Sequence, residues 1–525
     1  MPRRGIRQSH EVSIQIADFQ STYLPGDVII GHVVAKKAFG HGPRTDQTVV
    51  KLRLFGRTKS KIVSGSQEKT YRGQAVLVDE EQCIFRGTVS ANSKHSFAMT
   101  IPKTPQPGVA KTGDSWDKDE RGLRGIDKDR NFLSNTQEDI TKHSLPAVFY
   151  FGDSRALTGS VCEAFVEYFL EATLACPGVS DAKATLPLFI RSHSTEKPVD
   201  YNDYSFNVKS FQQITRSERL LPQNRDKKMT FRDKSKRLFT PSKVPSYSYR
   251  VSVATPPVIQ LDHPAPVPFK VHVAPIMEQN KMICPDGDIR RLPPIELVSV
   301  DMELVALTRV RCPGTLGDHS RDKETTYRIP IDEPIALANY NIPVVVQGDL
   351  KGPGDEPRDL SERANEQTAP GGSPFLEPNS LHVAVEGAVV PEGLIKHSSF
   401  QPHEKGQYFL GTPLDLGNNL DVRLTETKSS SLGGRPTTFE KRLWPSFATY
   451  NIVLSYQLVW KLKISCVGEI HTTEGRANVN ILPPSEAQGA GRQKIGQDAI
   501  KDYEHLTAAL NFTSEVGGFL DLLSV

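Results

Sequence analysis

Residues that could carry out catalysis are present in this 525-residue chain, but their spacing forms no recognisable site. The 14 histidines occur singly, and the neighbouring acids Glu80 and Glu81 are explained by solvation of a turn. The sequence contains no GxxxxGK[ST] phosphate loop, no HExxH, no GxSxG elbow and no kinase HRD or DFG motif. We therefore predict a protein without enzymatic activity, cofactor or metal.

The cysteines and the apolar runs bear on the cellular compartment. The six cysteines lie far apart and form no C-x-x-C pair, which matches neither a disulfide framework nor a zinc module. Residues 1–4 are followed by no apolar stretch, and the longest uncharged run, residues 443–460, is too polar to span a bilayer. These features predict a cytoplasmic protein.

The strongest polar feature is a basic stretch in the middle of the chain. Residues 216–243 contain ten Lys or Arg against three acids, although the whole chain carries a formal net charge of only +3. Such a stretch can bind phosphorylated protein tails or an anionic membrane surface, and the alternative is a solvated connection between two folded units. No nucleic-acid-binding motif accompanies the charge, so we expect no nucleic-acid partner. The candidate residues are Arg225, Lys227, Lys228, Arg232, Lys234, Lys236 and Arg237.

The elements that position these residues are predicted to be β-strands. In residues 162–174, apolar side chains alternate with Glu163, Glu167 and Glu171, which is the period-two pattern of a half-buried strand. Residues 452–466 alternate in the same way. Shorter examples occur at residues 12–16, 50–54, 97–101 and 298–304. Because turn residues separate these segments and no helical pattern regularly follows a strand, the sequence predicts an all-β fold of antiparallel sandwiches.

Changes in composition divide the chain into four parts. We expect a β-sandwich over residues 1–195, a basic interdomain connection over 196–248 and a second sandwich over 249–485. Residues 348–380 form a charged Gly/Pro-rich insertion in the second sandwich, and we expect it to be disordered because it cannot bury enough apolar surface. Residues 486–525 are expected to form a flexible tail with one short amphipathic helix.

Several segments resemble the arrestin family, in the order in which that family has them. Residues 23–33, YLPGDVIIGHV, are similar to the Y-x-P-G-[DE]-x-[IV]-x-G-x-V segment of arrestin N-terminal domains. Residues 159–174 are similar to the long G-x-V-x-Y-x-L-x-A-x-L strand of that domain. Residues 444–450, WPSFATY, resemble arrestin C-terminal domains, above all those of fungal arrestin-related proteins, the alpha-arrestins. Further similar segments are residues 50–57, 97–102, 145–149, 255–261 and 266–273.

The resemblance implies two tandem immunoglobulin-like antiparallel β-sandwiches, the arrestin fold, without an active site. Proteins of this family are adaptors that bind the cytoplasmic regions of membrane proteins. They link these cargoes to the machinery of endocytosis, protein transport and ubiquitination, so the resemblance also implies a peripheral location at the plasma membrane or endosomes. The alternative is a structural vesicle-coat subunit that resembles the retromer cargo-binding component, because it shares the double sandwich.

Two short peptides could connect such an adaptor to its partners. Fungal relatives recruit a HECT ubiquitin ligase whose WW domains read Pro-Pro-x-Tyr, and the nearest segment here, Val244, Pro245, Ser246 and Tyr247, lacks one proline. Alternatively, Pro245 ends the connection and Tyr247 begins the next strand. A second segment near the C-terminus resembles a clathrin-binding peptide, although it could instead dock on its own sandwich. The residues of that peptide are Phe519, Leu520, Leu522 and Leu523.

Overall fold

The computed structural model of the protein consists almost entirely of β-strands in the segments that it describes. The strands pair antiparallel, apart from the pairing of β11 (Val258–Gln260) with β18 (Glu469–Leu482) and an isolated bridge between Tyr23 and Ile190. The predicted all-β fold with antiparallel sheets is therefore confirmed. No helix in the described segments has the length and apolar character needed to span a membrane. The described residues are 11–17, 22–38, 47–63, 70–106, 143–155, 160–192, 195–225, 227, 243–285, 292–312, 319–329, 414–425 and 443–488.

The first eight strands make up what we call the N-terminal half. Their bounds are β1 Val12–Ile16, β2 Val28–Ala35, β3 Val49–Val63, β4 Thr70–Arg86, β5 Ser93–Thr100, β6 Phe149–Arg155, β7 Ser160–Ala175 and β8 Ala182–Leu188. One sheet has the order β1-β2-β5, and the other has the order β4-β3-β7-β6, with β8 paired to the remaining part of β7. The predicted strand at residues 162–174 lies within β7.

The remaining strands make up the C-terminal half. Their bounds are β9 Asn207–Arg216, β10 Ser246–Thr255, β12 Lys270–Pro275, β13 Ile295–Cys312, β14 His319–Arg328, β15 Leu414–Asp415, β16 Phe447–Ala448 and β17 Ile452–Cys466, together with β11 and β18. One sheet has the order β15-β12-β10-β9, and the other has the order β11-β18-β17-β13-β14, with β16 paired to β17. The predicted strand at residues 452–466 coincides with β17.

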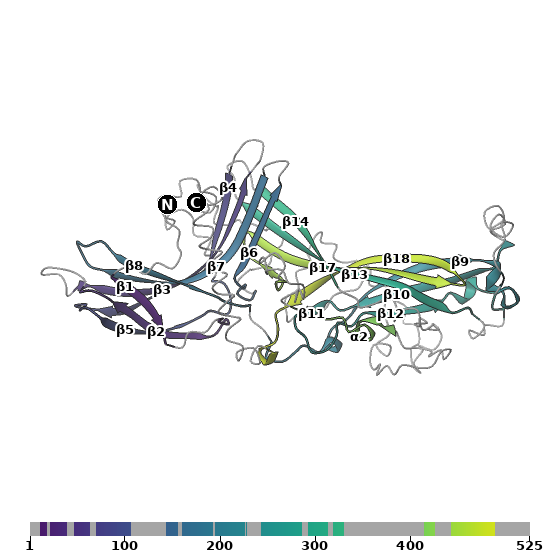
Figure 1. Cartoon of the computed structure of the whole chain (residues 1–525), viewed down its shortest axis with the longest axis horizontal. Coiled ribbons are helices and arrows are strands. Elements are labelled where there is room, and N and C mark those ends of the chain that lie inside the picture. The colour runs from purple at the N-terminus through teal and green to yellow at the C-terminus, as the bar shows by residue number, and fades with distance from the viewer. Residues whose placement is uncertain are drawn as a thin grey trace, which may run out of the picture.

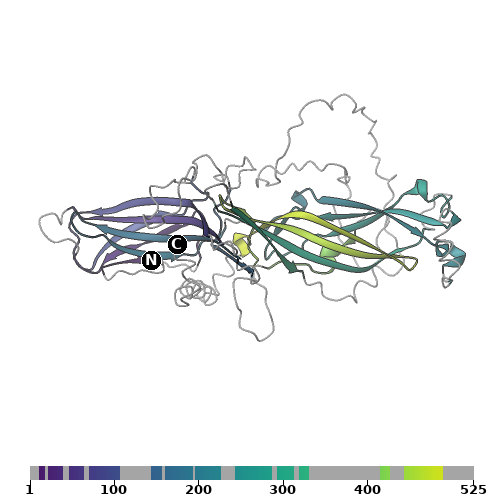
Figure 2. The ribbon, with the colours of Figure 1, turned by 90° about the horizontal axis from the view of Figure 1, so that it is seen from above.

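The two halves follow one another along the long axis of the molecule (Figure 1). The long strands β3, β4 and β7 bend upward near the middle of the molecule, where β6 runs beside β7, and the upright ends stand beside β13, β14 and β17 of the other half (Figure 1). The view from above shows the same end-to-end order (Figure 2). Contacts of β13 with β3 and β4, and of β14 with β3, connect the halves. We call this contact region the joint.

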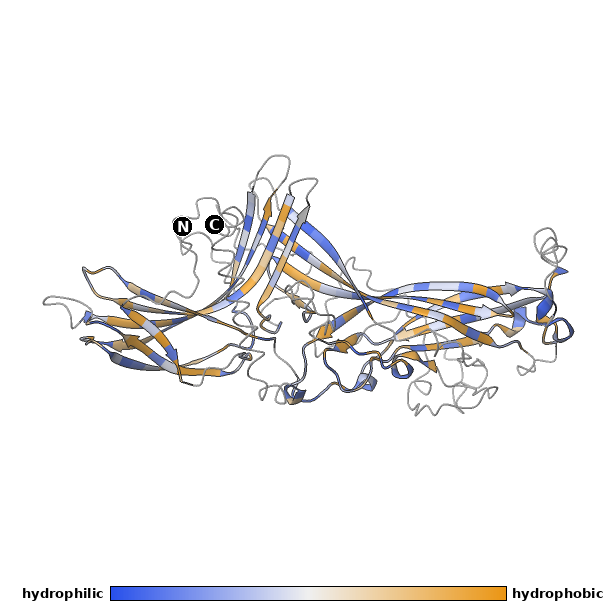
Figure 3. Cartoon of the chain, viewed as in Figure 1, coloured by the Kyte–Doolittle hydropathy of each residue, from blue (hydrophilic) through white to orange (hydrophobic). Residues whose placement is uncertain are grey.

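The core follows from the alternation of apolar and polar residues along the strands (Figure 3). Leu52 and Leu170 are fully buried in the N-terminal half, and Phe269 and Trp460 are buried in the C-terminal half. Burying one such side chain contributes about 1.5–3 kcal/mol, which is why the period-two pattern selects which face of each sheet turns inward. Most buried apolar side chains of both halves belong to one contiguous cluster, and Phe55, Val76 and Phe169 form a small separate one.

Two details of the strands differ from the sequence-based expectation. Residues 196–248, expected to be a connection, contain β9, which pairs with β10 over its whole length. Most side chains of β9 are polar because it lies at a sheet edge, so it lacks the alternation that marks the central strands. The alternation predicted over residues 298–304 fails at its first residue, because a β-bulge between Leu297 and Ser299 turns Val298 outward.

Other expectations fall on residues that lie outside the described segments. These are the insertion at residues 348–380, the short helix of the tail, and the tail itself beyond residue 488.

Candidate interaction surfaces

The centre of the joint is a buried polar network. Asn451 Nδ2 donates a hydrogen bond to Ser60 Oγ at 2.9 Å, and Thr58 Oγ1 donates to Asn451 Oδ1. Ser60 Oγ in turn donates to the carbonyl of Arg311 at 2.7 Å, and the Cys312 thiol donates to Ser60 Oγ at 3.4 Å. Thr58 and Ser60 belong to β3, whereas the other residues belong to the C-terminal half. Each half therefore satisfies polar groups of the other.

Aromatic rings flank this network. Phe149 of β6 makes edge contacts with the rings of Trp444 and Phe447, at centroid distances of 5.6 and 4.9 Å. Tyr71 of β4 stacks on His319 of β14 at a centroid distance of 3.4 Å. Aromatic pairs of this kind contribute about 0.5–1.5 kcal/mol beyond the burial of their area. The joint thus combines apolar packing with hydrogen bonds.

An ion-pair cluster lies where β6 meets β14. Asp153 accepts hydrogen bonds from Arg321 Nη2 at 2.7 Å and from Lys323 Nζ at 2.8 Å, and Arg321 also donates to Ser160 Oγ. Burial alone would raise the pKa of Asp153, but the hydrogen bonds and charges of Lys323 and Arg321 outweigh it and lower this pKa below its ordinary value. Asp153 is therefore ionised at neutral pH and ties the two sheet edges together.

Two thiols at the joint are chemically inactive in this arrangement. Cys162 of β7 and Cys312 of β13 are fully buried. The pKa of each thiol is raised to about 12, mainly by burial, and the proximity of Cys312 contributes to the rise at Cys162. The thiolate is the nucleophilic form, so neither residue can act as a nucleophile near neutral pH.

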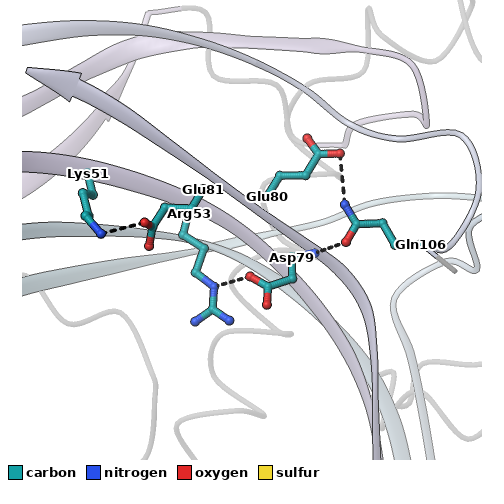
Figure 4. A network of polar contacts seen from close by, with 6 residues as sticks. All are labelled: Lys51, Arg53, Asp79, Glu80, Glu81 and Gln106. Atoms are coloured by element: carbon teal, nitrogen blue, oxygen red, sulfur yellow. Dashed lines mark hydrogen bonds and ion pairs between the residues drawn. The ribbon is translucent and has the colours of Figure 1, made fainter. Parts of the chain in front are cut away.

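The outward face of the five-stranded sheet in the N-terminal half carries a network of paired charges (Figure 4). Arg53 Nε donates to Asp79 at 2.6 Å, and its guanidinium lies 4.3 Å from the centroid of the Phe55 ring. On the same face, Lys51 pairs with Glu81 at 2.7 Å. Glu80 lies on the other face of β4, where it accepts from Gln106 Nε2 at 3.4 Å. Glu80 and Glu81 lie in β4 and not in a turn, and consecutive strand residues point to opposite faces. They form no catalytic pair.

Further along the same strands, charged residues are more deeply buried. Lys61 of β3 lies directly opposite Glu163 of β7. Burial lowers the pKa of Lys61 to about 8 and raises the pKa of Glu163, and the attraction between the two groups opposes both shifts. In the described segments, no group of His, Cys, Asp or Glu is arranged to hold a metal ion.

The far end of the C-terminal half, which we call the distal end, presents apolar side chains to solvent. Ile470 is 63% exposed and Met282 is 55% exposed, and Ile214 also points outward. Their neighbours are in contact: His471 shares a hydrogen bond with Thr215 Oγ1 at 2.8 Å. A further hydrogen bond of 3.3 Å joins Gln212 to Gln279, so that β9, β18 and the segment after β12 meet at this end.

The hairpin turn at the distal end has unusual backbone geometry. Val467 and Gly468, between β17 and β18, have φ angles of 48° and 83°. Two positive φ angles in a two-residue hairpin loop favour Asn-Gly, and a β-branched residue at the first position is strained. Strained backbone of this kind is concentrated at functional sites. Ile470, one of the exposed residues of the distal end, lies two residues after this turn.

The first residues of the predicted basic segment lie at the distal end. The carbonyl of Arg225 accepts a hydrogen bond from Arg219 Nε at 3.0 Å, and Lys227 Nζ donates to Asn224 Oδ1 at 2.7 Å. Arg219 also approaches the β17–β18 turn, because a Cβ at Gly468 would lie 2.6 Å from its guanidinium. The other predicted cationic residues lie outside the described segments: Lys228, Arg232, Lys234, Lys236 and Arg237.

The two short peptides predicted to bind partners have different outcomes. Val244, Pro245 and Tyr247 are all buried, and Tyr247 is part of β10 opposite Thr215. This burial does not fit a WW ligand, which must expose its tyrosine, and it fits the alternative in which Tyr247 begins a strand. The clathrin-like peptide lies outside the described segments, with its residues Phe519, Leu520, Leu522 and Leu523.

The joint residues were missed by sequence-based reasoning. Thr58 and Ser60 continue the face of β3 that carries Leu52 and Leu54, so polar residues at core positions were the available signal. No spacing rule could pair Ser60 with Asn451 or Asp153 with Arg321, because these pairs are formed only when the two halves meet.

Comparison with known proteins adds no identification. No protein-family model matches this chain. A search of curated proteins likewise finds no match. The functional conclusion therefore depends on the geometry of the joint and the distal end and on the motifs of the sequence.

Proposed function

We propose that this protein is a non-enzymatic, arrestin-like adaptor that binds cytoplasmic regions of membrane proteins and links them to endocytic and ubiquitination machinery. The observation that carries the proposal is the joint, in which two pairs of stacked sheets meet end to end through the Thr58, Ser60 and Asn451 network. In the proposal, each pair of sheets is an immunoglobulin-like sandwich, and together they are the tandem domains of an arrestin fold.

The chemistry of the described surfaces supports binding in place of catalysis. The charges on the outward face of the N-terminal half are paired with one another, as in Arg53 with Asp79. The buried thiols at the joint have pKa values of about 12. An adaptor requires extended surfaces held in a fixed relation, and the buried joint supplies that relation.

The distal end is the surface that we assign to an anionic membrane. It combines exposed Ile470 and Met282 with Arg225 and Lys227, where the basic segment begins. Each Lys or Arg near an anionic surface contributes about 1 kcal/mol, and exposed apolar side chains add binding energy when they enter the interface. Such a contact would place the adaptor beside its cargo at the plasma membrane or endosomes.

A flotation assay with phosphatidylserine-containing vesicles tests this surface. We expect the double substitution Ile470→Ser with Met282→Ser to reduce vesicle binding at least tenfold. The matched control is Val28→Ser with Ile30→Ser, because these exposed residues lie on β2 in the other half. Equal binding by both double variants and the wild type would contradict the membrane assignment.

The adaptor function itself is tested by proximity labelling in the native cell. We expect membrane proteins, together with a ubiquitin ligase or clathrin, among the labelled partners. Replacing Leu520 and Leu522 by Ala should remove the clathrin component alone. Labelling of neither membrane proteins nor trafficking machinery would overturn the proposal.

The alternative is a vesicle-coat subunit, and one observation favours it. The buried apolar cluster runs through both halves without a break, which suits a rigid scaffold that remains in one complex. Purification from the native cell separates the two functions. A stoichiometric, persistent coat complex supports the alternative, whereas transient association with a ligase and ubiquitin-modified lysines supports the adaptor.

A further inference from the structure

The chain segment that connects the two halves is bound by residues that follow the last strand. The connector, residues 191–206, leads from β8 to β9, and its residues 193–194 lie outside the described segments. The backbone N–H of Glu486 donates to the carbonyl of Thr195 at 2.9 Å. The N–H of Ala487 donates to the carbonyl of Glu196 at 3.2 Å. Backbone at the start of the tail is thus hydrogen-bonded to the connector.

A buried amide joins both segments to the C-terminal half. Gln260, at the end of β11, is only 1% exposed. Its Oε1 accepts from the backbone N–H of Val199 at 3.0 Å, and its Nε2 donates to Thr195 Oγ1 at 3.0 Å and to the carbonyl of Pro483 at 3.1 Å. One side chain therefore holds the connector on one side and the segment after β18 on the other.

Neighbouring residues reinforce this arrangement. His263 Nε2 lies 2.8 Å from the carbonyl oxygen of Val199, and its ring packs against Tyr201 at a centroid distance of 4.6 Å. The side-chain amide of Gln488 donates to the carbonyl of Asp262. These contacts hold the connector against the end of the C-terminal half that lies nearest β11.

The four residues 485–488 form a turn that has one half of a capping box. Gln488 Oε1 accepts from the backbone N–H of Ser485 and from its Oγ, both at 2.7 Å, and the N–H of Gln488 donates to the carbonyl of Ser485 at 3.0 Å. The bond from the Ser485 N–H to the Gln488 side chain is the one found at helix starts, and Glu486 is then the first residue of the turn. The turn leaves the backbone N–H groups of Glu486 and Ala487 available for the carbonyls of the connector.

We propose that residues 485–488 are a clamp that couples the start of the tail to the connector and restricts the motion of the two halves. The clamp goes beyond the proposed function because it would act whatever the cargo. Thr195, Glu196, Glu486 and Ala487 are exposed, and the hydrogen bonds that join the two pairs are made by backbone groups. Such contacts open far more easily than the buried joint, so the clamp is the reversible part of the connection.

A proline substitution tests the clamp with little risk to folding. Glu486→Pro removes the N–H that donates to Thr195, and proline is well tolerated at the first position of a helical turn. Glu486→Ala removes the same side chain but keeps the N–H, so it is the matched control. In hydrogen exchange of the full chain, we expect amides of residues 195–201 to exchange about tenfold faster in Glu486→Pro only.

The effect of the clamp on the motion of the two halves is measured as the distribution of distances between two spin labels, one in each half. One spin label is placed on Cys83, the exposed cysteine of β4, and a second on Thr472→Cys in β18. We expect the distribution to broaden in Glu486→Pro and to remain narrow in Glu486→Ala. Faster exchange without broadening would overturn the coupling, and equal behaviour of both variants would overturn the clamp. Neither measurement involves cargo or membrane. A result that overturns the clamp would therefore not contradict the adaptor function.

Discussion

The joint buries polar groups, whereas the distal end exposes apolar groups. At the joint, Ser60 and Asn451 are buried and hydrogen-bonded across the two halves, and the charge of Asp153 is paired. At the distal end, Ile470 and Met282 are exposed. The hydrogen bonds and the ion pair of the joint hold the two halves together, whereas the apolar surface of the distal end is available for contact with another molecule.

Replacing Phe149 by Ala should have the largest effect on stability. The side chain is 3% exposed and lies between Trp444 and Phe447, so its removal leaves a cavity at the joint. We expect a loss of about 3–5 kcal/mol in the free energy of unfolding, measured with denaturant. A loss below about 1 kcal/mol would show that the joint is not tightly packed.

Asn451→Ala should have the next largest effect, a loss of about 2–3 kcal/mol in the free energy of unfolding. The substitution removes the two buried hydrogen bonds that Asn451 makes with Thr58 and Ser60, and it leaves a cavity at the centre of the joint. Asn478→Ala is the control because Asn478 is exposed on β18, and it should change stability by less than about 0.5 kcal/mol. Similar losses in the two variants would contradict a special role for the network.

Asp153→Asn should lower stability by about 1–2 kcal/mol at pH 7, and the effect should depend on pH. The folded protein lowers the pKa of Asp153 from its ordinary value of 3.8, so the ionised form is stabilised by folding. The difference in stability between wild type and variant should therefore be complete at pH values above the ordinary pKa of 3.8. It should shrink as the pH falls through the lower pKa that Asp153 has in the folded protein.

The control for this ion pair is Asp322→Asn. Asp322 forms an exposed pair with Arg309 at 3.9 Å, and exposed pairs contribute little. Thermal unfolding between pH 3 and pH 7 checks both variants. A stability difference for Asp153→Asn that does not vary over this range would contradict the ion-pair assignment.

Val467→Asn should have the smallest effect and the opposite sign. Asparagine accepts the positive φ of this turn more readily than valine, so we expect a gain of about 0.5–1 kcal/mol in stability. A loss would show that the partly buried Val467 side chain contributes more through packing than its backbone costs. Vesicle binding measured on the same variant shows whether the strained turn serves the distal surface.

The sequence predicted the strands with a clear alternation well, including the short β1 at residues 12–16, and it missed the polar edge strand β9. The alternation in β7 and β17 is strong because one face of each strand is buried along its length. β9 was missed because an edge strand can be polar on both faces, and Val298 was misplaced because a bulge shifts the register. The position of the basic segment was clear from composition, but its neighbours at the distal end were not.

The sequence alone determined the all-β character of this protein, because an alternating pattern can bury one face only as a strand. It also determined that positive charge is concentrated in residues 216–243. The tertiary structure decided that Ser60 meets Asn451, that Asp153 meets Arg321, and that Gln260 holds the connector. These pairs are far apart in the chain, and local periodicity carries no information about which distant polar group will satisfy a buried one.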